Sequence, residues 1–114
     1  MLEIIPNAWD IIRAENQFND PPAPGRQFIM ARVGVSYVGP GSGTPWVALT
    51  IRFVGSDGNT YGGAMADYTG VIPRPLTDIG EQFSGAVAEG NVAWSVPMPA
   101  IPGGVISISE GWRP

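Results

Sequence analysis

A short polar stretch, GSDGNTY at residues 55–61, carries the residue types of a cation site. Asp57 and Asn59 offer carboxylate and amide oxygens two positions apart, which is how a calcium-binding loop begins. The glutamate that such a loop places further along the chain is missing at the required spacing. An Asp-Gly pair at the tip of a hairpin explains the same residues without a metal. We predict a hairpin turn here and keep Asp57 and Asn59 as candidate calcium ligands.

The four tryptophans are the second group that could bind a ligand. Trp94 belongs to an alternating apolar run and is predicted to be in the core. Trp9 is predicted to lie at an edge and to pack against the core. Trp46 begins a predicted strand, and Trp112 follows the last one. Aromatic rings exposed near Gly/Pro loops can stack on sugars or anchor a protein partner. Trp46 and Trp112 are therefore candidate ligand-binding residues, with capping of the open ends of the core as the alternative.

Several catalytic side chains are missing from the composition. The chain has no His and no Cys, and its six basic residues are all Arg. A serine nucleophile would have no His or Lys to activate it, and a zinc–sulfur site would have no thiolate. The ten acidic residues fall mostly at predicted turns and strand ends, where solvation and turn capping explain them. We expect a protein that is not an enzyme and uses no cofactor.

The charge pattern narrows the choice of partners. The net charge is −4, and the arginines are scattered rather than gathered in a stripe. Such a chain is a poor ligand for nucleic acid and for an anionic membrane surface. No apolar run approaches the roughly 20 residues of a membrane-spanning helix. The chain opens without the basic and apolar regions of a signal peptide, so a cytoplasmic location stays open beside an exported one.

Alternation of apolar and polar residues with period two predicts an all-β protein. Sixteen Gly and twelve Pro supply turns between many short strands. The number and spacing of the strands favour a single β-sandwich domain over residues 1–114 with about seven antiparallel strands, and a small barrel is the second choice. No segment has a clear amphipathic helical pattern. The predicted strands are 8–14 at an edge, 27–38, 46–54, a return strand from 60, a short one near 67–69, 88–96 and 105–109.

A proline-rich block, FNDPPAPGR at residues 18–26, stands directly before the strongest predicted strand. Its prolines hold the backbone extended and reduce the freedom of the unfolded chain. We expect this segment to carry the chain across the end of the sandwich from one sheet to the other. Asn19 or Asp20 would accept backbone hydrogen bonds, Gly25 would take a positive φ, and Phe18 would plug the core. A role as a proline-rich ligand is disfavoured, because strands flank the block on both sides.

Three segments of the chain resemble a known family in order and spacing. FNDPPAPGRQFIMARVGVSYVG, GSDGNTY and EGNVAWSVP resemble the motifs of secreted or lipid-anchored bacterial domains of uncharacterised function. That family is similar to an immunoglobulin-like sandwich also found in a mycobacterial secreted immunogenic antigen. The resemblance implies an extracellular or cell-surface domain with an immunoglobulin-like fold. It implies no catalytic or ligand-binding residues, and the chain lacks the family's usual N-terminal export segment.

Taken together, the residues and the resemblance predict a non-enzymatic extracytoplasmic module. Its role would be structural or would lie in contact with another protein or a cell-envelope component. The alternative is a carbohydrate- or calcium-binding β-sandwich that uses Trp46, Trp112 or the Asp57 turn. Weak self-association through an unpaired edge strand is a third hypothesis.

Overall fold

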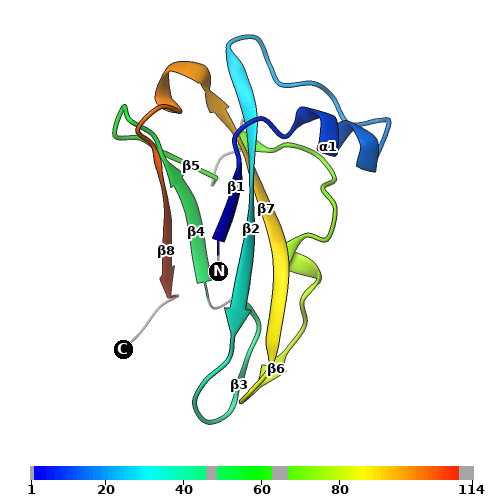
Figure 1. Ribbon diagram of the computed structural model, residues 1–114, viewed down its shortest axis with the longest axis vertical. Coiled ribbons are helices and arrows are strands. Elements are labelled where there is room, and N and C mark those ends of the chain that lie inside the picture. Colours follow the sequence, from blue (N-terminus) through cyan, green and yellow to red (C-terminus); the bar gives the residue numbers. More distant parts are fainter. Residues whose placement is uncertain (1, 46–48, 63–66, 111–114) are drawn as a thin grey trace.

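The computed structural model describes residues 2–45, 49–62 and 67–110. This part of the chain is mostly β-structure, as the alternating pattern predicts, with one α-helix among the described residues (Figure 1). Two single-turn 3-10 helices, η2 and η3, interrupt the later half. The elements in chain order are β1 (Leu2–Ile5), α1 (Trp9–Glu15), β2 (Arg26–Ser36), β3 (Ser42–Gly43), β4 (Leu49–Val54), β5 (Thr60–Tyr61), η2 (Leu76–Asp78), β6 (Gln82–Phe83), β7 (Val87–Pro97), η3 (Met98–Ala100) and β8 (Val105–Glu110).

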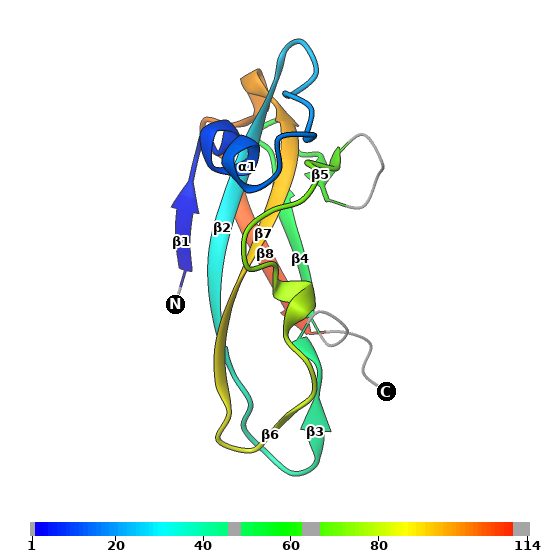
Figure 2. The same cartoon turned by 90° about the vertical axis from the view of Figure 1, so that its right-hand side faces the viewer.

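The strands form two three-stranded antiparallel sheets and one short ribbon. The first sheet has the order β1-β2-β7, and the second has the order β5-β4-β8. In the first sheet the long strands β2 and β7 pair along their whole length, from Arg26 opposite Pro97 to Ser36 opposite Val87. The ribbon, β3 with β6, lies at the far end of these long strands from α1 (Figures 1 and 2).

The main core lies between the two sheets. Alternate side chains of β2 and β7 point into it, and so do Ile51 and Phe53 of β4. Trp94 of β7 is 2% exposed, and its ring centroid lies 6.4 Å from that of Phe53. The prediction that Trp94 lies in the core is confirmed, because a period of two places every second residue on one side of a sheet. The core members from the long strands are Ile29, Ala31, Val33, Trp94 and Val96.

A second, smaller cluster lies on the opposite face of β2. Phe28 and Met30 are both 3% exposed there and pack with Ala8 and Ile12. Trp9 joins this cluster through an edge-to-face contact with Phe28, with ring centroids 5.9 Å apart. Strand β2 is therefore covered on both faces, by the second sheet on one side and by α1 on the other.

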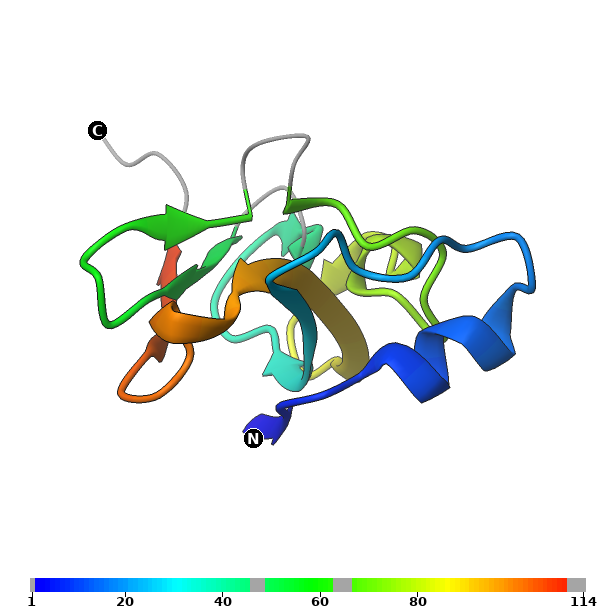
Figure 3. The ribbon, with the colours of Figure 1, turned by 90° about the horizontal axis from the view of Figure 1, so that it is seen from above.

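The prediction of an edge strand at residues 8–14 is wrong, because this segment forms α1 (Figure 3). Ala8 and Ile12 are four residues apart, so a helix brings both to the face that covers β2. Asp10 in the first turn and Arg13 in the last turn complement the helix dipole. The edge strand lies earlier, at β1, which pairs with β2 from Leu2 opposite Val33.

The prediction that the prolines carry the chain between the sheets is also wrong. The block joins α1 to β2, and β1 and β2 are neighbours in the same sheet. Gly25 adopts a φ of +81°, as predicted. Phe18 does not plug the core, because it is 83% exposed.

Two further predictions concern the middle of the chain. The hairpin turn at Asp57 and Gly58 is confirmed by β4 and β5, which pair from Val54 opposite Thr60. The short strand expected near residues 67–69 is not formed. No helix within the described ranges is long and apolar enough to cross a membrane.

Candidate functional site

The predicted calcium ligands lie in the tight turn between β4 and β5. One carboxylate oxygen of Asp57 accepts the backbone N–H of Asn59 at 3.0 Å. The other accepts the side-chain amide of Asn59 at 3.1 Å and the hydroxyl of Tyr61 at 2.6 Å. The sequence places these groups together because an Asp side chain bonds the backbone two residues on, and the return strand begins at once.

The hydrogen bonds of this turn shift the pKa values of two side chains at the surface. The hydroxyl of Tyr61, helped by the backbone N–H of Asn59, lowers the pKa of Asp57 below its usual value of 3.8. The same hydrogen bond to Asp57 raises the pKa of Tyr61 above 10.0. The pair thus favours an ionised Asp57 and a protonated Tyr61 at neutral pH.

Calcium binding by Asp57 and Asn59 stays a prediction. The three hydrogen bonds to Asp57 explain the turn without a cation. Within the ranges that the structure describes, no three His, Cys, Asp or Glu residues gather into a metal-binding group. The candidate ligand-binding residues Trp46 and Trp112 lie outside the described residues.

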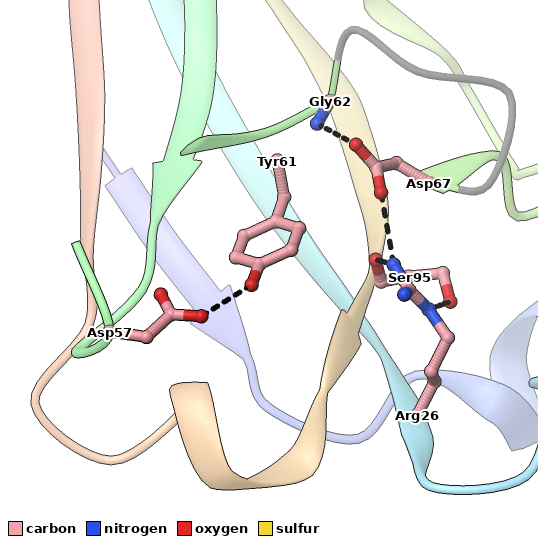
Figure 4. Close-up of polar contacts among 6 residues, drawn as sticks. All are labelled: Arg26, Asp57, Tyr61, Gly62, Asp67 and Ser95. Atoms are coloured by element: carbon pink, nitrogen blue, oxygen red, sulfur yellow. Dashed lines mark hydrogen bonds and ion pairs between the residues drawn. The ribbon is translucent and has the colours of Figure 1, made fainter. Parts of the chain in front are cut away.

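The most extensive polar arrangement of the described chain was not predicted. It is centred on Arg26, the first residue of β2 (Figure 4). The guanidinium donates from Nε to the hydroxyl of Ser95 at 2.9 Å and from Nη2 to the Ser95 carbonyl at 2.6 Å. Nη2 also forms an ion pair with Asp67 at 2.9 Å. The second oxygen of Asp67 accepts the backbone N–H of Gly62 at 2.8 Å.

This network is partly withdrawn from water and connects separate regions of the chain. The side chain of Asp67 is 8% exposed and that of Arg26 is 21% exposed. The guanidinium carbon also lies 6.0 Å from the ring centroid of Tyr61, whose hydroxyl bonds Asp57. The network therefore fixes β2, β7 and the end of the β4–β5 hairpin relative to one another. The sequence has no His or Lys that could activate the Ser95 hydroxyl.

Asp67 also begins a segment that crosses the side of the first sheet. We call residues 67–78 the crossover segment. Asn19 holds it by bonding Val71 twice, accepting its N–H at 2.9 Å and donating to its carbonyl at 2.7 Å. Asn91 of β7 holds it again by donating from its side chain to Pro73 at 2.8 Å and from its backbone to Arg74 at 2.8 Å.

A groove of about 560 Å³ lies between β4, β7 and the crossover segment. Its surface is largely apolar, with Leu49 and Ile51 on one side and Val92 and Trp94 on the other. Arg52 supplies a cation, and none of the described residues that line the groove is acidic. The described lining therefore includes no pair of facing carboxylates, such as a glycosidase uses.

The composition and spacing of residues gave no signal for the Arg26–Asp67 pair. The two residues are separated by 41 positions, and Asp67 lies in a segment without a sustained period. Comparison with models of known protein families, with curated proteins and with solved structures gives no match to this chain.

Proposed function

We propose that this chain is a non-enzymatic, immunoglobulin-like β-sandwich module that works outside the bacterial membrane through contact with another protein or a cell-envelope component. The two-sheet core supports the sandwich assignment. The resemblance of residues 18–39, 55–61 and 89–97 to secreted and lipid-anchored bacterial domains supports the location. Each of these supports is independent of the other.

The observation that carries the non-enzymatic proposal is how the described polar side chains are used. Arg26, Asp67 and Ser95 bond one another, and Asp57 bonds Tyr61. These contacts fasten strands and turns together, and they present no nucleophile beside a base. A domain of this kind acts through its surface.

The outer edge of β8 is the surface that best suits contact. β8 is the last strand of the order β5-β4-β8, so one of its edges has no partner strand among the described residues. In Figure 1 it forms one side of the molecule. Proteins block such edges with Lys, Pro, bulges or short strands. VISISE runs for six residues with a charge only at its last position, Glu110, so this edge can accept an extended strand.

Self-association through β8 tests this contact surface directly. Two copies of β8 that pair antiparallel about the centre of the strand would place Glu110 opposite Val105, so no like charges would meet. Light scattering over a series of concentrations is expected to show a mass that rises toward a dimer for the natural sequence. Ser107→Lys, which adds a charge to an exposed position of the edge strand, is expected to abolish the rise.

The control is Ser84→Lys, which adds the same charge in the exposed turn after β6. It should associate like the natural sequence. If the natural chain stays monomeric at every concentration, or if both variants behave alike, self-association through β8 is refuted.

The compartment is tested separately. Antibodies raised against the domain should label intact native cells as strongly as permeabilised ones. Labelling that requires permeabilisation would contradict an extracytoplasmic location and would leave the test of β8 unaffected.

A further inference from the structure

A second cleft, of about 360 Å³, lies where the proline-rich block meets the crossover segment. Phe18 and Tyr68 line it although they are 83% and 68% exposed, so their rings stand at its mouth. Phe28 and Ser95 line its floor and are 3% and 2% exposed. The volume lies within the range of about 300 to 1,000 Å³ that small-molecule sites occupy.

Hydrogen bonds tie together the two chain segments that carry the exposed rings. Asn19, next to Phe18, donates to the carbonyl of Ile12 at 2.9 Å and makes its two hydrogen bonds to Val71. These contacts tie the start of the proline-rich block to the crossover segment, 52 residues further along. The fold therefore maintains the cleft without help from a ligand.

The prolines make the wall of the cleft rigid. Pro21 lines the cleft, and Pro22 and Pro24 continue the restricted backbone toward β2. A wall that is already ordered loses little conformational entropy when a ligand binds. This gives the proline-rich block a role that does not require it to cross between sheets.

The chemistry of the lining favours one class of ligand. Exposed aromatic rings offer flat apolar faces, which match the C–H face of a sugar ring. Asp20 lines the cleft and lies outside the ion pairs of the described chain, which use Glu3, Asp10, Asp67 and Glu89. An ionised carboxylate accepts hydrogen bonds and donates none, so it suits the hydroxyl groups on the edge of the same ring.

We propose that this cleft binds a neutral saccharide, with sugar rings against both Phe18 and Tyr68 and a sugar hydroxyl donating to Asp20. No Arg is among the described residues that line the cleft, so nothing there attracts a sulfated or phosphorylated sugar. The proposal goes beyond contact through β8 and does not depend on it. It also differs from the sequence hypothesis of carbohydrate binding at Trp46 and Trp112.

The experiment is a titration of the whole chain with neutral oligosaccharides, namely cellohexaose, chitohexaose, maltohexaose and mannohexaose. Two-dimensional NMR would follow the ring signals of Phe18 and Tyr68 and the amide of Gly70. At least one sugar should shift these signals below about 10 mM, the upper range of weak specific binding. A polyproline decapeptide serves as a competing class of ligand, because it too can stack on exposed rings.

Three variants locate the binding. Phe18→Ala and Tyr68→Ala are each expected to weaken it about tenfold or more, as for the loss of a central aromatic contact. Asp20→Asn should weaken it less, because the amide keeps one acceptor oxygen. Phe83→Ala is the matched control, since Phe83 is 62% exposed in β6, at the far end of the long strands.

All of these side chains are exposed, so equal unfolding midpoints would show that the variants fold. The proposal is overturned if no sugar shifts the cleft signals, or if the peptide alone shifts them. It is equally overturned if Phe18→Ala and Tyr68→Ala bind like Phe83→Ala.

Discussion

Asp57 accepts three hydrogen bonds and Asp67 accepts two, yet the two carboxylates lie in opposite environments. Asp57 lies in an exposed turn, and all its partners come from the next four residues. Asp67 is buried, and its ion-pair partner Arg26 lies 41 residues away. Water can replace the bonds of the first carboxylate, and it cannot easily replace those of the second. The same side chain therefore shapes a local turn in one place and fastens the fold in the other.

Asp67→Ala is expected to cause the largest loss in the free energy of unfolding. The substitution leaves the guanidinium of Arg26, 21% exposed, without its counter-charge, and leaves the N–H of Gly62 without an acceptor. We expect a loss of about 3 kcal/mol in the free energy of unfolding, measured by urea denaturation. Asp67→Asn should cost less, because an amide oxygen can still accept one hydrogen bond.

Asp57→Ala is the matched control for this substitution. It removes a carboxylate that accepts three hydrogen bonds, against two at Asp67, but from a solvated turn, so the loss of stability should be clearly smaller. Equal losses at the two positions would show that burial does not distinguish them.

A second comparison uses two glycines, one in the turn at Asp57 and one in the crossover segment. Gly58 follows Asp57 with φ +84°, and Gly70 lies in the crossover segment with φ +93°. A Cβ at Gly58 meets nothing within 4 Å, whereas one at Gly70 would clash with the Asn19 side-chain oxygen. We expect Gly58→Ala to cost about 1 kcal/mol, from backbone strain alone.

Gly70→Ala should cost about 2 to 3 kcal/mol, because it adds displacement of the Asn19 amide to the same strain. Thermal and urea unfolding of the two variants measure the difference. If they are equally stable, the hydrogen bonds of Asn19 do not hold the crossover segment. Gly70→Ala should then also leave the signals of Phe18 and Tyr68 unchanged.

The parts of the fold that the sequence predicted are those with a local or periodic signal. Alternation along β7 identified Trp94 as a core residue, because a strand sends every second side chain to one face. The Asp-Gly pair likewise identified the hairpin turn. These features depend on neighbours in the sequence.

The features that were missed depend on contacts between distant segments. A seven-residue helix is too short to show its period, so α1 looked like any short apolar strand. Phe18 was placed in the core on the basis of its hydrophobicity, but large apolar residues also occur on the surface. Neither Arg26 nor Asp67 has a neighbour that indicates an ion pair. Ligand binding by Trp46 and Trp112 stays a prediction.

The smallest expected change in stability comes from Tyr61→Phe, through the pKa of Asp57. The pKa of Asp57 is lowered chiefly by the hydroxyl of Tyr61. A carboxyl whose pKa is lower in the folded state than in the unfolded state stabilises the fold fully at pH values above the unfolded-state pKa. That contribution is lost as the pH falls through the folded-state pKa, below 3.8. Tyr61→Phe removes the main cause, so the pKa of Asp57 should rise toward 3.8 and the acid-dependent part of the stability should shrink.

Carboxyl-carbon NMR titration of Asp57 measures this shift. Tyr68→Phe is the control, because Tyr68 is exposed at the other cleft and should leave the pKa of Asp57 unchanged. An unaltered pKa in Tyr61→Phe would mean that the hydroxyl does not bond Asp57 in solution. Asp57 would then be bonded by Asn59 alone. The contact of the Tyr61 ring with Arg26 would no longer connect Asp57 to the Arg26 network. The exposed and the buried carboxylates would then belong to separate networks, each with its own contribution to stability.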